Sequence, residues 1–176
     1  MDMLTPLLFA FLANDNARRA EAEAAFAEMK KTSTRDVIIA LAQQIFTDPP
    51  ELRPLAAVML RGITVREPDL LRSLEPTDAE QLRGWLLQGL EATLAHPNRR
   101  KVIDCIAANA RLGQWPALYS LVGKLAGGDE VHVISALEII EKLAGLFSYI
   151  LMTIPFVDEI MHRYRVYWTR TCRTCK

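Results

Sequence analysis

The chain has 176 residues, of which 51% are hydrophobic, a share too high for a disordered protein. Lys plus Arg and Asp plus Glu both total 21, so no overall basic charge points to nucleic acid. Three cysteines and no signal peptide favour a reducing, intracellular compartment over a disulfide framework. We therefore expect a folded core and no specific nucleic-acid partner.

Apolar residues recur at helical spacing from the N-terminus onward, and no segment alternates like a half-buried strand. The first predicted helix runs from Thr5 to Asn14, and Asp15 or Asn16 is expected to cap a second that ends near Lys31. The predicted inward residues of the second helix are Ala22, Ala25, Phe26 and Met29.

A third helix is predicted after Ser33 or Thr34, ending at the turn from Thr47 to Pro50. Its predicted inward residues are Val37, Ile38, Leu41 and Ile45. A fourth helix beginning near Leu52 or Arg53 would place Pro54 in its first turn, where a missing N–H does no harm. Its predicted inward stripe is Leu52, Leu55/Ala56, Met59/Leu60 and Ile63.

The second half of the chain repeats this pattern. Residues 66–76 are expected to be a polar connection, and Thr77 with Glu80 has the pattern of a capping box that opens a helix over residues 78–95. Pro97 is expected to open a helix to about Leu112. Two further helices are predicted, one from Trp115-Pro116 to Gly127-Gly128 and one over residues 130–147 capped by Asp129.

The predicted helices form pairs whose starts recur at roughly 40 residues, an interval typical of HEAT-like hairpins. We predict an all-α fold, a right-handed α-solenoid of about four such hairpins. A closed four-helix bundle would use the same helices, but short loops inside the pairs and longer connections between some of them favour the solenoid.

Four segments carry a family resemblance in order and spacing. They are Arg18-Arg19 with Ala22-Glu23 and Phe26; Glu51, Arg53, Ala56-Ala57-Val58, Leu60 and Arg61; Arg99-Arg100-Lys101-Val102, Asp104, Ala107, Ala110 and Arg111; and Gln114-Trp115-Pro116. Over about residues 4–147 the chain resembles the N-terminal HEAT repeats of the importin-β (karyopherin-β) superfamily, nearest the importin-β3 branch.

The resemblance implies a nuclear transport receptor-like module that takes part in protein import into the nucleus. It implies binding of Ran-GTP through the second (B) helix of each hairpin, on the concave surface, and contacts with cargo proteins and phenylalanine-glycine nucleoporins. The implied location is the cytoplasm and nucleus, including the pore. Because the family continues through many more repeats, a truncated form is expected. The alternative is a short HEAT-repeat scaffold without GTPase coupling.

Charged residues at helical spacing are the candidates for such a surface. Arg53, Ala57 and Arg61 recur at intervals of four, and small Ala57 is expected to leave that face open. Mixed charges suit a charged protein partner, although solvated helix faces have the same spacing. The Ran-binding candidates are Arg19, Glu23, Arg53, Arg61, Lys101, Asp104 and Arg111.

No enzyme, cofactor or metal site is predicted. The three histidines, His96, His132 and His162, lack a nucleophile or carboxylate at a recognised motif spacing, and Gly127-Gly128 lacks the lysine of a phosphate-binding loop. Cys172-x-x-Cys175 has the spacing of half a zinc site, but the other half is missing.

The C-terminal part changes in composition. The apolar run from Leu143 to Val157 is shorter than the roughly 20 residues that span a bilayer, so we predict a helix that covers the end of the solenoid. We predict two regions, the HEAT repeats over residues 1–147 and a divergent basic and aromatic tail over residues 148–176.

Overall fold

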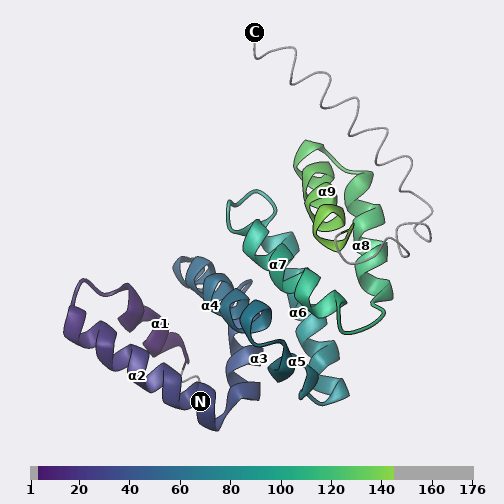
Figure 1. Cartoon of the computed structure of the whole chain (residues 1–176). Helices are drawn as coiled ribbons and strands as arrows, with labels where there is room; N and C mark the ends of the chain where they lie inside the picture. The colour runs from purple at the N-terminus through teal and green to yellow at the C-terminus, as the bar shows by residue number, and fades with distance from the viewer. Residues whose placement is uncertain (1–3, 145–176) are drawn as a thin grey trace. The chain divides into compact units, whose positions relative to one another are not determined.

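The computed structural model describes residues 4–144, and Figure 1 shows these residues as helices joined by short connections. In chain order the elements are α1 (Leu4–Leu12), α2 (Asn16–Thr32), α3 (Thr34–Gln44), the 3₁₀ helix η1 (Pro50–Leu52), α4 (Arg53–Arg66), α5 (Pro68–Arg72), α6 (Pro76–Thr93), α7 (Arg99–Ala110), α8 (Pro116–Ala126) and α9 (Glu130–Ala144). The described residues include no strand, so the all-α prediction is confirmed.

Consecutive helices pack as pairs, namely α1 with α2, α3 with α4, α6 with α7 and α8 with α9. We call the first helix of each pair the A helix and the second the B helix. The chain divides into two compact units, one ending at Leu112 and the other beginning at Gly113. The sequence did not predict this boundary, and the predicted boundary after residue 147 lies outside the described residues.

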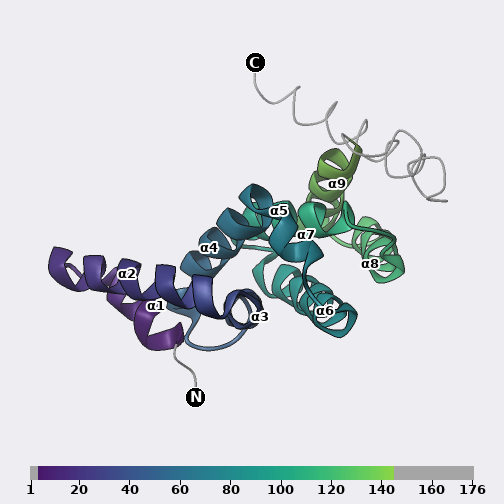
Figure 2. The same ribbon diagram turned by 60° about the horizontal axis from the view of Figure 1, so that its bottom comes forward.

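In the first unit the pairs stack on one another. The A helices α3 and α6 are in contact, as are the B helices α4 and α7, and both neighbouring arrangements are visible in Figure 2. A Cβ atom added to Gly89 of α6 would lie 2.7 Å from Cγ2 of Ile45, so a glycine permits the close approach of the two A helices. Stacking of hairpins through both helices is the arrangement of a helical solenoid.

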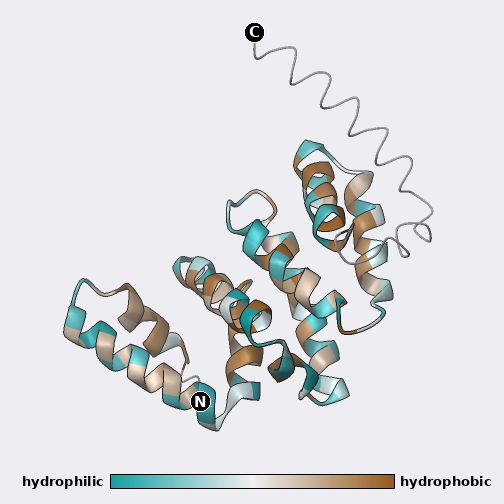
Figure 3. Cartoon of the chain, in the orientation of Figure 1, coloured by the Kyte–Doolittle hydropathy of each residue, from teal (hydrophilic) through white to brown (hydrophobic). Residues whose placement is uncertain are grey.

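The stacked helices bury apolar residues on the sides that face their neighbours. Helix α2 buries one residue, Ala22, whereas α7, which packs against both α4 and α6, buries seven of its twelve. Ala25, predicted to face inward, is exposed, because α2 packs mainly against α1 and has few neighbours elsewhere. The same contrast appears in Figure 3, where α1 is mostly hydrophobic and α2 is largely hydrophilic or neutral.

Helix α4 begins at Arg53, so Pro54 lies in its first turn as predicted. The helix buries two sides, and its buried residues are Ala56, Ala57, Leu60, Ile63 and Thr64. The prediction that Ala57 leaves a face open is therefore wrong. Thr64, one heptad after Ala57, hydrogen-bonds Cys105 of α7, so the side that carries both residues packs against α7 as well as the core.

Several predicted helix ends need correction. The connection expected over residues 66–76 contains the short helix α5, and α7 begins at Arg99, two residues after Pro97. Helix α6 begins at Pro76 and has no side-chain cap, so the capping box of Thr77 and Glu80 does not form. In contrast, Asp15 caps α2 as predicted, through bonds to the backbone N–H groups of Ala17 and Arg18.

The first turn of α6 instead makes an ion pair with α3. Arg35 donates from Nε to Oδ2 of Asp78 at 2.5 Å and from Nη2 to Oδ1 at 2.6 Å. The Asp78 side chain is nearly buried, and the hydrogen bond from Arg35 is the main reason that the pKa of Asp78 is lowered. This two-pronged pair fixes the two A helices at their N-terminal ends.

The second unit contains the α8 and α9 pair within its described residues. Trp115, just before α8, is buried, and its core residues include Leu118, Val122, Ile139 and Leu143. Asp129 precedes α9 and accepts a bond from the backbone N–H of His132 at 3.1 Å, which agrees with its predicted capping role. The predicted end of this helix at residue 147, the apolar run and the tail lie outside the described residues.

A substitution in the shared core tests this packing. Leu60 is completely buried, so Leu60→Ala should lower the free energy of unfolding by about 2 to 5 kcal/mol, through lost burial and the cavity left behind. Val58 on the same helix is 45% exposed, and Val58→Ala serves as the control, with an expected change within about 0.5 kcal/mol. Urea unfolding followed by circular dichroism measures both. Equal effects of the two changes would contradict the assignment of Leu60 to the core.

The Arg35–Asp78 pair predicts a dependence of stability on pH. Because the pKa of Asp78 is lower in the folded state than in the unfolded chain, the pair stabilises the fold above the ordinary carboxyl pKa and this stabilisation is lost as the pH falls through the folded pKa. Asp78→Asn should therefore be less stable than the native sequence at pH 7, and the difference should shrink between about pH 5 and pH 2. Thermal unfolding of both proteins across this range measures it. A difference that stays constant down to the lowest pH would show that the pair makes no such contribution.

Candidate functional site

The seven candidate residues lie on three B helices of the first unit or at their ends. Arg19 and Glu23 lie on α2, Arg53 and Arg61 on α4, and the remaining candidates on α7 or at its C-cap, namely Lys101, Asp104 and Arg111. Helices α4 and α7 are in direct contact. Helix α2 is joined to the end of α4 by the ion pair of Lys30 Nζ with Glu67 Oε1, at 2.7 Å.

Arg61 and Asp104 are brought together. Arg61 donates from Nε to Oδ2 of Asp104 at 2.5 Å, which joins α4 to α7. The two residues are 43 positions apart, as are Arg35 and Asp78, and the A helices α3 and α6 begin 42 residues apart, at Thr34 and Pro76. The B helices α4 and α7 begin at Arg53 and Arg99, so both ion pairs span close to one repeat of the chain, and stacking of successive hairpins brings the paired residues together.

Burial distinguishes the two members of this pair. The Asp104 side chain is 16% exposed, whereas that of Arg61 is 45% exposed. The Asp104 carboxylate is therefore mostly buried between α4 and α7, and it holds the Arg61 guanidinium at the surface. An arginine held in this way keeps its remaining N–H donors available to a partner in a fixed direction.

Arg53 does not share this position. Its Nε donates to the carbonyl oxygen of Thr47 at 3.1 Å, and its Nη2 lies 3.3 Å from Oδ1 of Asp48. These bonds attach the first turn of α4 to the turn that follows α3. The structure thus gives Arg53 a local role in holding that turn and does not bring it together with Asp104.

The two candidates on α2 have different surroundings. Arg19 is half-buried, and its Nη2 donates to the carbonyl oxygen of Ala13 at 3.3 Å, within the connection between α1 and α2. Glu23, one turn along the helix, is exposed. Glu23 is therefore available at the surface of α2, whereas Arg19 contributes to the local packing of the first hairpin.

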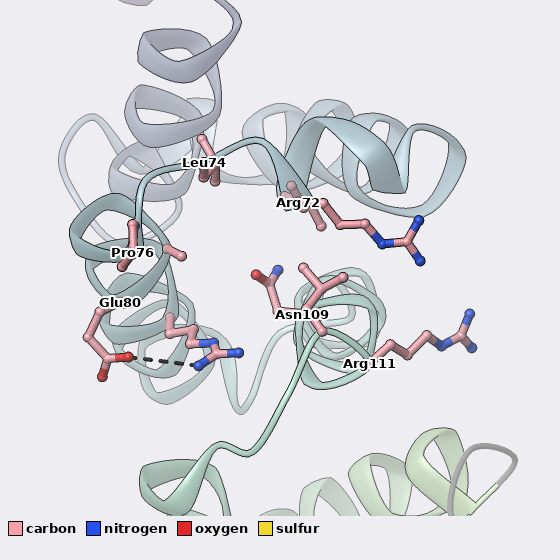
Figure 4. A pocket seen from close by; sticks show the side chains of 10 residues that line it. Arg72, Leu74, Pro76, Glu80, Asn109 and Arg111 are labelled. Atoms are coloured by element: carbon pink, nitrogen blue, oxygen red, sulfur yellow. Dashed lines mark ion pairs between the residues drawn. The ribbon is translucent and has the colours of Figure 1, made fainter.

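The other two candidates lie at opposite ends of α7. Lys101 is half-buried in the first turn of the helix. Arg111 is exposed at the C-cap, where it lines a hollow together with residues of α5 and α6 (Figure 4). Arg111 lies seven residues after Asp104, about two helical turns, so it is separated from the Arg61–Asp104 pair along the helix.

Two apolar residues that the sequence analysis did not select flank Arg61. Val58 and Val65 are each 45% exposed, and they lie three residues before and four residues after Arg61 on α4. We call Val58, Arg61 and Val65 the α4 face. The sequence shows the spacing of these valines, but valines at helical spacing are equally typical of buried core residues. Only the packing of α4 against both α3 and α7 shows which side remains exposed.

The described residues hold no metal-binding cluster, and the one cysteine among them is buried. Residues 4–144 contain no group of three or more His, Cys, Asp or Glu side chains that could hold a metal ion. Burial raises the pKa of the Cys105 thiol to about 12, so this thiol is a poor nucleophile. No helix among these residues combines the length and apolar character needed to cross a membrane. The predicted half zinc site at Cys172 and Cys175 lies outside the described residues.

Comparisons with known proteins bear on the fold. No family model matches the chain, and the curated proteins give no match. The crystal structure of Kap121p bound to RanGTP is similar, with a TM-score of 0.71 and 24% identity over 88% of this chain and 15% of Kap121p. A crystal structure of Kap121p without a stated partner has a TM-score of 0.70 and 27% identity, over 80% of this chain and 14% of Kap121p. A crystal structure of a Kap121p mutant also has a TM-score of 0.70 and 27% identity, over 81% of this chain and 14% of the mutant.

These matches confirm the all-α solenoid and agree with the resemblance to the importin-β family, to which Kap121p belongs. The chain spans about 15% of the length of Kap121p. Its fold is that of a nuclear transport receptor-like HEAT array.

A double-mutant cycle tests the link between α4 and α7. Arg61→Ala, Asp104→Ala and the double variant should give a coupling energy of about 0.2 to 1 kcal/mol in the free energy of unfolding, as expected for a partly exposed pair. The coupling should decrease in 1 M NaCl, roughly the concentration at which the screening length falls to 3 Å. Strictly additive effects at low salt would show that the pair contributes nothing to stability.

Proposed function

We propose that this chain is a nuclear transport receptor-like HEAT module that binds Ran-GTP through its B helices and takes part in protein import into the nucleus. The observation that carries the proposal is the similarity to Kap121p, including the crystal structure in which Kap121p is bound to RanGTP. The segments that resemble importin-β in sequence support it, because most of them lie on α2, α4 and α7.

The composition of the B-helix surface supports a protein partner. The α4 face combines two exposed valines with an arginine whose guanidinium is fixed by Asp104. Arginine and apolar side chains are typical of the central part of protein interfaces, where they contribute much of the binding energy. The B helices α2 and α7 carry exposed Glu23 and half-buried Lys101, so the B helices present both signs of charge. Mixed charge fixes the orientation of a charged partner more than it increases affinity.

Other partners follow from the same proposal. Cargo proteins and phenylalanine-glycine nucleoporins are proposed partners, with a location in the cytoplasm, the nucleus and the pore. They rest on the family resemblance alone, whereas the proposal of a Ran site is also supported by the residues of the α4 face.

The dependence of binding on the bound nucleotide tests the function. Immobilised protein should retain Ran loaded with a non-hydrolysable GTP analogue and should retain much less Ran-GDP, because a transport receptor distinguishes the two states of the GTPase. Bound Ran is measured by surface plasmon resonance at several concentrations. Equal retention of both forms, or none, would count against the receptor and favour a scaffold without GTPase coupling.

Substitutions on the α4 face test the location of the site. Arg61→Glu should weaken binding of Ran-GTP roughly tenfold or more, because a central arginine is replaced by the opposite charge. Arg72→Glu makes the same change in charge on α5, which carries none of the candidate residues, and should leave the affinity within about twofold. Circular dichroism checks that both variants keep their helix content.

A charge swap separates binding from stability. The double variant Arg61→Asp with Asp104→Arg can re-form an ion pair between α4 and α7 while it reverses the order of charges on the surface. Ran-GTP binding should remain weak in the swap even where thermal stability recovers. Full recovery of affinity together with stability would mean that Arg61 supports the fold and does not contact Ran.

A further inference from the structure

A hollow in the first unit lies away from the α4 face, and none of the candidate residues except Arg111 lines it. It has a volume of about 570 Å³, within the range of pockets that bind ligands, and it is formed by α5, the start of α6 and the end of α7 (Figure 4). The lining residues are Leu71, Arg72, Leu74, Pro76, Ala79, Glu80, Arg83, Asn109, Arg111 and Leu112.

The hollow has a local excess of positive charge. Three of its lining residues are arginines and one, Glu80, is acidic, in a chain whose total charge is zero. Figure 4 shows the side chains of Arg72 and Arg111 extending to the same side of the hollow. An incoming anion would therefore meet two guanidinium groups at this side.

The ion pairs within the protein would not prevent Arg72 and Arg111 from binding a carboxylate of a partner. Arg72 pairs with Asp69 at 2.6 Å, but the Asp69 side chain is 87% exposed, so this pair is solvated and weak. Arg111 makes no ion pair with any described residue. Glu80 lies 3.9 Å from Arg83, at the limit of an ion pair, and its side chain is largely exposed. A carboxylate from a partner could replace the surface contact of Arg72 at little cost.

The rest of the lining includes a buried amide and several apolar side chains. Asn109 is buried, its Nδ2 donates to the carbonyl oxygen of Cys105 at 3.0 Å, and Figure 4 shows its amide directed into the hollow. Leu71 is buried as well, and further apolar lining comes from Leu74, Pro76 and Leu112. The hollow therefore offers contacts for an apolar side chain next to its cationic side.

We propose that this hollow binds an acidic segment of a partner protein, with carboxylates paired to Arg72 and Arg111 and a neighbouring apolar side chain against Leu74 and Leu112. A peptide carboxylate suits the site better than a free phosphate, because a neighbouring apolar side chain of the peptide can also contact the apolar part of the lining. The zero net charge of the chain also provides no long-range attraction for a nucleic acid. This proposal does not depend on Ran binding.

Selection from a random peptide library tests the proposal without a known partner. The full chain is immobilised, bound dodecapeptides are sequenced, and enriched peptides should carry Asp or Glu next to an apolar residue. The affinity of the best peptide, labelled with fluorescein, is then measured by fluorescence anisotropy. Arg72→Glu combined with Arg111→Glu should weaken it roughly tenfold or more, because like charges then face each other.

The matched control is Arg61→Glu, which makes the same type of change on the α4 face and should leave peptide affinity within about twofold. Arg72→Glu alone should weaken the peptide and spare Ran-GTP, so failure here and failure of the Ran proposal are distinguishable. Circular dichroism confirms that the variants fold. Selection without an acidic consensus, or peptides that bind the double variant unchanged, would overturn the proposal. Displacement of the peptide by inorganic phosphate but not by chloride at equal ionic strength would overturn it in favour of a phosphate site.

Discussion

The structure of the first unit depends on a core that no hairpin can form alone. Helix α4 buries five residues toward two neighbours, so its hairpin requires the next one for burial. Helix α2 shows what a B helix looks like with few neighbours, because it buries only Ala22. Burial between hairpins therefore decides which residues remain at the surface, and so defines the candidate site.

Repetition also determines where charges meet. Arg35 pairs with Asp78 on the A helices and Arg61 with Asp104 on the B helices, both across 43 residues. These pairs contribute modest energy compared with the buried leucines and isoleucines. Their main effect is to fix how one hairpin is aligned with the next, because a shift of one helical turn between stacked hairpins would separate both pairs at once.

The sequence predicted the helices, their pairing and the position of Pro54, because helical periodicity and proline chemistry are local properties. It failed where neighbours decide the outcome. Ala57 was predicted to be open and is buried, because helical spacing within α4 carries no information about the packing of α7. The hollow was missed because residues 66–76 were read as a polar connection, whereas α5 places Arg72 at its rim. The family resemblance selected Arg61 and Asp104 separately, but only stacking shows that they pair.

The α4 face and the hollow both contain arginines, but the arginine side chains are held to different degrees in the two surfaces. Arg61 is fixed by a carboxylate that is mostly buried, so much of the entropy cost of ordering its side chain is met during folding and a partner with matching geometry gains affinity and orientation. Arg72 and Arg111 are held loosely or not at all by described residues, so a partner must order them and gains less from any single contact. The α4 face is suited to one well-defined globular partner. The hollow is suited to short acidic segments of varied sequence, because loosely held guanidinium groups can adjust to carboxylates at different positions.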